Sequence, residues 1–468
     1  MSSNPDDVPN KTSEAREMQA RRLQDKKSKR GRYVSNDLLL SATSKAQKRI
    51  LPLLTGLYFF AILDRVNVGV AGLTMSRDLH LTAQAFGLGA GIFFIGYVLN
   101  EIPSNIMMHR LGGRVWLARI AITWGILAAA VALATGTKSF VALRFMLGIS
   151  EAGFFPGVLY FMSLWFPAAQ KAKVNAAFLF AIPAGNAIGA IISTLLLRLD
   201  GFMGLAGWQW LFVAEGLPPV LLGIILLTNF ADRPAQATWL STEERLALVT
   251  KINSEADADA GHTNIASVLS SPTVWVLGLV CFGLSATLAS LSMWLPQLVH
   301  GLGTVSVEQA GFLTAAALFP GAFIMYLWSK RSDATGERVW HVAIPSVVAG
   351  LAWLCVSAAH VLWLKLLLLL ILGASGYASF AVFWAIPPRI FSIQTRAFGV
   401  AMISAIGNLG AFFGPWFIGY EKSAHGSFAG GFEGIGISLF ISAALIVLLR
   451  KQEQIRKPQS IPATEKRV

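Results

Sequence analysis

Charged residues are scarce in this 468-residue sequence: Asp, Glu, Lys and Arg make up only 13% of it, whereas soluble domains contain about a quarter. Hydrophobic residues make up 54%, and the mean hydropathy is +0.59. Such a composition is typical of a chain that is surrounded by lipid. Since a membrane-spanning helix needs about 20 apolar residues, the length of the chain leaves room for roughly a dozen spans.

Several kinds of site are excluded by residues that the sequence lacks. Cysteine occurs only at Cys281 and Cys355, both within apolar runs, where we expect small core residues rather than a disulfide framework or a metal site. The seven histidines fall in loops or near span ends, which argues against a histidine-based catalytic centre in the membrane. No cytoplasmic segment contains a Walker-type phosphate loop or a dinucleotide fingerprint. We therefore expect no metal, no cofactor and no enzyme activity.

Much of the net charge of +13 lies near the amino terminus, where residues 1–50 contain 12 Lys and Arg against 6 Asp and Glu. This segment has no apolar run of the kind found in a cleavable signal peptide. A basic segment before the first apolar run is typical of a cytoplasmic tail, and we favour this interpretation over nucleic-acid binding. The inner loops and the carboxyl tail are basic too, which predicts a multi-pass inner-membrane protein with both termini in the cytoplasm.

Apolar runs between charged residues, glycines and prolines predict twelve membrane spans. The spans are expected to start near Leu51, Phe86, Val115, Phe140, Val174, Trp208, Pro272, Gln309, His341, Leu362, Ala397 and Phe432. One long inner segment divides them into two sets of six, which is typical of transporters with a site near the membrane midplane. The fold class is therefore all-α, with two six-helix halves.

The same reading divides the chain into five parts. They are a basic cytoplasmic tail (1–50), an amino-terminal half (51–231), a cytoplasmic linker (232–271), a carboxyl-terminal half (272–450) and a cytoplasmic tail (451–468). Within the linker, the sequence Ser-Thr-Glu-Glu at 241–244 predicts the start of a short helix.

Four charged residues fall inside spans, at Asp64, Arg65, Arg144 and Glu151. Each costs about 3 kcal/mol or more at the membrane centre and needs a reason. Asp64 and Arg65 lie roughly 20 Å into the first span, and Glu151 lies roughly 17 Å into the fourth. These four residues could form two buried ion pairs that fix helix packing. Because adjacent helix residues point roughly 100° apart, Asp64 and Arg65 cannot pair with each other, and we favour a substrate or proton path in which Arg65 is free for a ligand.

Other polar groups lie at similar depth, including Tyr97, Asn186 and Asn408. Ligand contact and interhelical hydrogen bonding are equally good interpretations for Tyr97 and Asn408, whereas a structural role is favoured for Asn186. Trp384 could form a cavity wall or pack in the bulk of the bundle. Glu101 and Glu215 lie nearer to span ends, where we expect a structural or gating role.

Five segments together resemble one known family. They are residues 63–71, 96–105, 144–156, 207–216 and 407–415, which read LDRVNVGVA, GYVLNEIPSN, RFMLGISEAGFFP, GWQWLFVAEG and GNLGAFFGP. From about residue 51 to residue 450, the chain is similar to the anion:cation symporter family of the major facilitator superfamily. This family includes bacterial carriers of galactonate, tartrate, phthalate and 4-hydroxyphenylacetate. The resemblance implies the major facilitator fold and the import of organic anions with protons.

The resemblance also implies roles for individual residues. Asp64 and Glu151 match the protonatable carboxylates of the family, Arg65 matches its carboxylate-binding arginine, and Arg144 matches a partner in that network. With all four ionised, their charges sum to zero, so an anion would bind best after protons have arrived.

In the same comparison, Tyr97 and Asn408 match residues of the substrate cavity, to which we add Trp384 as a candidate contact. One feature departs from the superfamily. Residues 103–110 lack the usual aspartate of the loop motif, although the second copy keeps Asp333. The usual charge pairing that closes the amino-terminal half therefore lacks its aspartate in this loop.

The function predicted from these observations is secondary active uptake of a small carboxylate by proton symport through alternating access, in a monomer. Sodium coupling, anion exchange and drug efflux are alternatives within transport, and a membrane receptor or membrane enzyme is the alternative outside it. The sequence leaves open whether the acid is aromatic, a sugar acid or a dicarboxylate. A mild preference for aromatic acids rests on five side chains, Phe59, Phe60, Phe93, Phe94 and Trp384.

Overall fold

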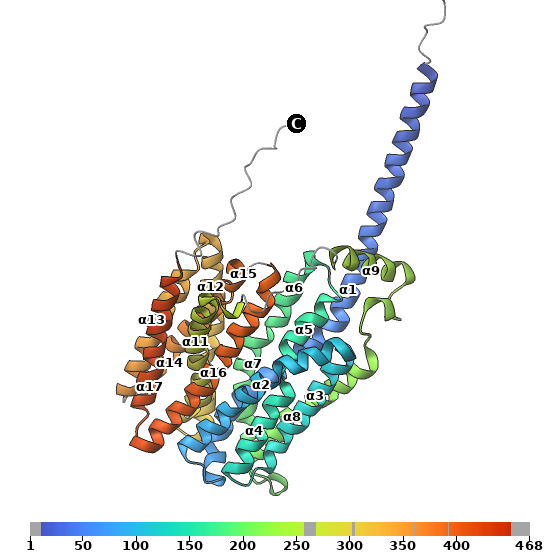
Figure 1. Ribbon diagram of the computed structural model, residues 1–468. Coiled ribbons are helices and arrows are strands. Elements are labelled where there is room, and N and C mark those ends of the chain that lie inside the picture. The colour runs from blue at the N-terminus through green and yellow to red at the C-terminus, as the bar shows by residue number, and fades with distance from the viewer. Residues whose placement is uncertain (1–10, 257–267, 302–304, 360, 392, 451–468) are drawn as a thin grey trace, which may run out of the picture.

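The computed structural model describes residues 11–256, 268–301, 305–359, 361–391 and 393–450. Within these ranges the chain is helical and contains no strand. Twelve helices or pairs of consecutive helices in the described part are long and apolar enough to cross a membrane. The predicted all-α fold with twelve spans is therefore confirmed (Figure 1).

The helices of the first six spans lie in the amino-terminal part of the chain. They are α1 (Lys11–Asp78), α2 (Ala83–Leu111), α3 (Gly113–Ala130), α4 (Thr137–Glu151), α5 (Phe154–Ser163), α6 (Ala168–Leu179), α7 (Ala181–Leu197) and α8 (Gly207–Asn229). Short 3-10 helices lie at Val131–Leu133, Phe202–Gly204 and Pro234–Gln236. Most spans start within a few residues of the expected positions. The first differs most, because α1 continues without a break through the basic segment into the apolar one.

The linker helix α9 (Thr242–Ala256) precedes the last six spans. Their helices are α11 (Pro272–His300), α12 (Val307–Thr335), α13 (Val339–Ala358), α14 (Leu362–Phe383), α15 (Pro387–Ile390), α16 (Ile393–His425) and α17 (Ala429–Leu448). Cys281 is buried on α11 as expected. The core position expected for Cys355 is wrong, because this residue lies on an exposed face of α13.

A break in the fourth span fixes the position of Glu151. Helix α4 ends at Glu151, and Gly153 then adopts a left-handed conformation with φ of 83° before α5 begins. A Cβ atom at this glycine would lie only 2.5 Å from the Oγ atom of Ser104 on α2, so both the turn and the close approach favour glycine. The carboxylate of Glu151 therefore stands at a helix end inside the bundle.

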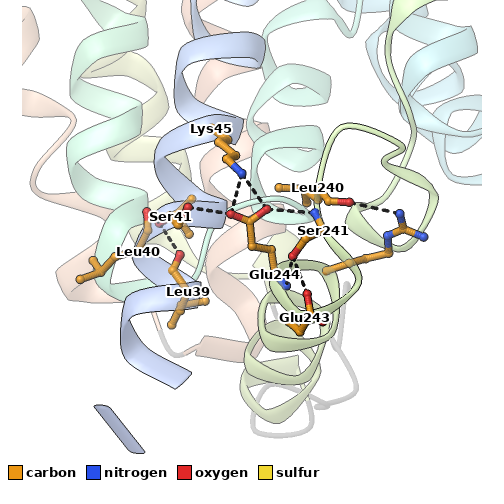
Figure 2. A network of polar contacts seen from close by, with 10 residues as sticks. Leu39, Leu40, Ser41, Lys45, Leu240, Ser241, Glu243 and Glu244 are labelled. Atoms are coloured by element: carbon orange, nitrogen blue, oxygen red, sulfur yellow. Dashed lines mark hydrogen bonds and ion pairs between the residues drawn. The ribbon is translucent and has the colours of Figure 1, made fainter. Parts of the chain in front are cut away.

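The linker helix is fastened to the amino-terminal half through Glu244 (Figure 2). Its carboxylate accepts hydrogen bonds from Lys45 Nζ at 2.7 and 2.9 Å and from Ser41 Oγ at 2.6 Å. Ser241 and Glu244 also form a reciprocal capping box, which confirms the helix start expected at 241–244. The bonds from the Lys45 ammonium, then those from Ser41 and the Ser241 backbone, lower the pKa of Glu244 to about 2.

Residue Asp232, just after α8, supplies the acidic group that the loop at 103–110 lacks. The backbone N–H of Arg114 donates to Asp232 Oδ1 at 2.7 Å, and the Arg114 guanidinium lies 3.9 Å from the same carboxylate. In the second half, Asp333 pairs with Arg338. Both halves thus carry an Asp–Arg pair. The aspartate comes from the segment after α8 in the first half and from the end of α12 in the second.

The two halves approach each other most closely at the end of the bundle opposite to the linker helix α9 (Figure 1). Helix α1 packs on α11, α2 on α16, and α7 on α12. A Cβ atom on Gly69 would lie 2.4 Å from the Ser292 carbonyl oxygen, and one on Gly87 would lie 2.4 Å from that of Pro415. An ion pair between Arg198, directly after α7, and Glu308 of α12 adds to this contact. We name these contacts between the halves the closed end.

Candidate functional site

An ion pair between α1 and α4 forms the centre of the site. The Nη2 atom of Arg65 donates to Oε1 of Glu151 at 2.6 Å. The Glu151 side chain is 1% exposed, whereas that of Arg65 remains 28% exposed. The expectation that Arg65 lacks a protein partner is therefore wrong, because the break after α4 brings Glu151 against the face of α1 that carries Arg65. Arg65 is nevertheless reachable by a ligand.

Aromatic rings support both arginines of the site. The Cζ atom of Arg65 lies 5.6 Å from the ring centroids of Phe93 and Tyr97, and that of Arg144 lies 5.1 Å from the ring of Phe93. The face of an aromatic ring attracts a cation at such distances. The ring of Phe93 on α2 therefore attracts both guanidinium groups, that of Arg65 from α1 and that of Arg144 from α4.

Arg144 is fully buried on α4. Among the described residues, none of its guanidinium nitrogens has a hydrogen-bond partner. Its charge interacts at longer range with Asp64 and Glu151, which attract it, and with Arg65, which repels it. Two ion pairs were the alternative interpretation for these four residues, and only the Arg65–Glu151 pair is seen in the described part of the chain.

A second network joins Asp64 to Glu215 of α8. The side-chain amide nitrogen of Asn67 donates to Asp64 Oδ1 at 3.1 Å and to Glu215 Oε2 at 2.8 Å, and Ser193 of α7 donates to Glu215 Oε1 at 2.7 Å. All four side chains are buried. The sequence predicts only that Glu215 lies near a span end, and it indicates no partner for this carboxylate. The only feature of the sequence that pointed to Glu215 is its position in the segment 207–216, which resembles the symporter family.

The remaining candidates are divided between the halves. Tyr97 lies beside Arg65, as described above. Trp384 follows α14 and packs edge-on against Phe380 and Phe383. Asn408 lies on α16, one helical turn from Phe412, whose carbonyl oxygen closely approaches Gly91 of α2. The amino-terminal half therefore holds the charged cluster, and Trp384 and Asn408 belong to the opposite half. Asn186 donates to the Ile182 carbonyl of its own helix, consistent with a structural role.

Twelve spanning helices, two halves that meet at one end, and buried charges in one half define a membrane transporter. Residues 54–307 match the sequence model of the Major Facilitator Superfamily, and the chain belongs to this family. The family resemblance expected from the sequence is thereby confirmed, and the protein is a transporter rather than an enzyme.

Two relatives and one solved structure illustrate the similarity. A protein of Agrobacterium vitis, provisionally named a tartrate transporter, is 43% identical over 423 residues, which cover 89% of this chain and 96% of that protein. The quinolone resistance transporter of Acinetobacter baumannii is 35% identical over 415 residues, 88% of this chain and 96% of the relative. A bacterial homolog of the human lysosomal transporter Spinster shares the fold, with a TM-score of 0.68 at 19% identity, over 87% of this chain and 96% of that chain.

Proposed function

We propose that the protein is a secondary active transporter that imports a small organic anion together with protons. The observation that carries this proposal is the Arg65–Glu151 ion pair, in which a partly exposed guanidinium is held by a buried carboxylate. Arginine binds carboxylates through two parallel hydrogen bonds. A substrate carboxylate can therefore replace Glu151 as the partner of Arg65. The name of the Agrobacterium vitis relative also supports an acid as cargo.

Displacement of Glu151 from Arg65 by the substrate couples binding of the anion to binding of a proton. Once Arg65 turns to the substrate, Glu151 is a buried carboxylate without its nearest cation, and a charge in that position is costly. Uptake of one proton on Glu151 removes the charge. Binding of the anion and binding of the proton then favour each other equally, as linkage requires. Asp64 is the second coupling carboxylate in this proposal.

The substrate contacts proposed beside Arg65 are Arg144 and Tyr97 from the charged half and Trp384 and Asn408 from the other. The unpartnered nitrogens of Arg144 provide further donors for an anion. In this proposal the inner membrane of the cell holds the protein, and both termini lie in the cytoplasm. The closed end then faces outward, and the site opens to the cytoplasm. One chain carries the whole site, so a monomer suffices.

The test is uptake of labelled tartrate and of a panel of aromatic, sugar and dicarboxylic acids into proteoliposomes with an acidic exterior. At least one acid should accumulate above its outside concentration, with sodium replaced by choline, and a proton ionophore should abolish accumulation. Arg65→Lys is the matched variant, because it keeps the charge and loses the two-point contact. Accumulation that requires sodium, or that ignores the pH gradient, would contradict the proposal.

Drug efflux by proton exchange is a second candidate, favoured by the similarity to the quinolone resistance transporter of Acinetobacter baumannii. The same vesicles with an acidic interior distinguish the two functions. Efflux by exchange requires a labelled quinolone to accumulate as protons leave, whereas symport predicts accumulation only with the opposite gradient.

A further inference from the structure

Glu215 is a buried carboxylate that the mechanism above does not use. It is 4% exposed and lies eight residues into α8, about 12 Å from the start of that helix. Its two oxygens accept hydrogen bonds from Ser193 and Asn67, both uncharged. The only charged group that interacts with it among the described residues is Asp64, which repels its ionised form. The α3 side of α8 at this level is apolar and closely packed, with Gly125 and Ala129 against Gly216.

The partners of Glu215 can serve it with or without a proton. A serine hydroxyl donates to an ionised carboxylate and accepts from a protonated one, and a half-turn of the Asn67 amide exchanges its donating NH2 group for its accepting oxygen. Arginine, by contrast, is always charged and has no acceptor, so the Arg65–Glu151 pair favours an ionised carboxylate. Glu215 is therefore placed among groups that tolerate a change of protonation.

Two further oxygens indicate that this network receives protons. Oδ1 of Asn67 and Oδ2 of Asp64 are buried and have no hydrogen-bond partner within the described residues. A protonated carboxyl group supplies the donor that such an acceptor needs. Charge counting agrees. Asp64, Arg65, Arg144 and Glu151 sum to zero when ionised, so an anion that arrives beside an ionised Glu215 adds to an uncompensated negative charge inside the membrane, and uptake of a proton on Glu215 removes that cost.

We propose that Glu215 is a further proton-binding site of this transporter, whose protonation is coupled to that of Asp64 through the Asn67 amide. The amide offers its NH2 group to both carboxylates at once, so one rotation changes the preferred state of both. Each carboxyl gains one proton on an oxygen and loses it from the same atom, without other chemistry. Ser193 lies four residues before the end of α7, beside Thr194, which faces Gly311 of α12 at the closed end. The network therefore reaches from mid-depth toward the contact between the halves.

This inference rests on the proposed proton coupling, and the experiment separates the two. Purified wild-type protein, Glu215→Gln and the exposed control Glu433→Gln are mixed with the transported acid in weakly buffered solution, and proton uptake per bound anion is measured with a pH dye. The expected result is about one proton fewer for Glu215→Gln and no change for Glu433→Gln. Counterflow exchange shows that the variant is folded. No proton uptake by the wild type would overturn the proposed function, whereas equal uptake by wild type and Glu215→Gln would overturn only the role of Glu215.

Ser193→Ala provides a second route if Glu215→Gln does not fold. It removes one donor to Glu215 and leaves the Asp64 bond to Asn67 in place. Because hydrogen bonds to an ionised carboxylate are stronger than those to a neutral one, the midpoint of the pH profile of anion binding should move to higher pH. A profile identical to that of the wild type would refute the proposal.

Discussion

Replacing Glu151 by Gln should tighten anion binding while it abolishes accumulation. In the ligand-free protein, Glu151 competes with the substrate for Arg65 through a charge-assisted hydrogen bond of 2.6 Å. Such a bond to a charged group is worth roughly 1.5–3 kcal/mol. Glutamine keeps the size of the side chain but not the charge, so the substrate no longer has to displace an anion. At about 1.4 kcal/mol per factor of ten, the dissociation constant should fall by roughly 10- to 100-fold.

The assay combines binding and transport on the same preparation. Equilibrium binding at pH 7 gives the affinity, counterflow between equal pools measures exchange, and a pH gradient measures accumulation. Glu151→Gln should retain exchange and lose accumulation, since the permanently neutral side chain neither takes up nor releases a proton. Glu433→Gln, exposed on α17, is the control with the same chemical change. Unchanged or weaker binding by Glu151→Gln would refute the competition for Arg65, and preserved accumulation would refute its place in coupling.

Three further predictions concern charge, pH and the linker. Arg65→Lys should bind the anion roughly 10-fold to 100-fold more weakly, because an ammonium does not form the two-point contact; near-normal affinity would contradict the assignment. In the wild type, anion affinity should rise as pH falls, measured where the substrate stays ionised, and a flat profile would exclude protonation before binding. Lys45→Ala should lower the free energy of unfolding by about 1 kcal/mol without loss of exchange, measured as a lower melting temperature. The pKa of Glu244 is lowered to about 2 in the folded protein. The loss of stability caused by Lys45→Ala should therefore be present above about pH 4.5 and vanish as pH falls toward 2. An equal loss of stability at pH 2 would contradict the ion pair with Glu244.

The spans could be predicted because each needs a long apolar run, and because the charges and prolines near its ends can be read directly from the sequence. The unbroken α1 could not, since a basic helix outside the membrane has no apolar pattern that distinguishes it from a tail. The linker helix was predictable from its capping residues alone, whereas its attachment to Lys45 depends on contacts between segments about 200 positions apart.

The charged residues of the site were identified because their burial is expensive, but their partners were not. The direction of Arg65 relative to Glu151 depends on how α1 and α4 face each other and on the break at Gly153. Distance from a helix end also gave no partner for Glu215, because depth alone does not tell which neighbouring helix presents one. Asn67 lies only three residues after Asp64, yet its amide became significant only with α8 beside it.

Bare backbone forms much of the contact at the closed end, and this has a mechanical consequence. Gly69 meets the carbonyl of Ser292 and Gly87 meets that of Pro415, and beside Gly87 the ring of Phe86 packs edge-on against Trp294 of the other half. Separation of the halves must part this aromatic pair, whereas at the two glycines it parts only backbone contacts. A single methyl group at either glycine would act as a wedge, since it would stand 2.4 Å from an oxygen. Alanine at position 69 or 87 should thus trap the transporter with this end parted, a simple means of isolating the opposite conformation.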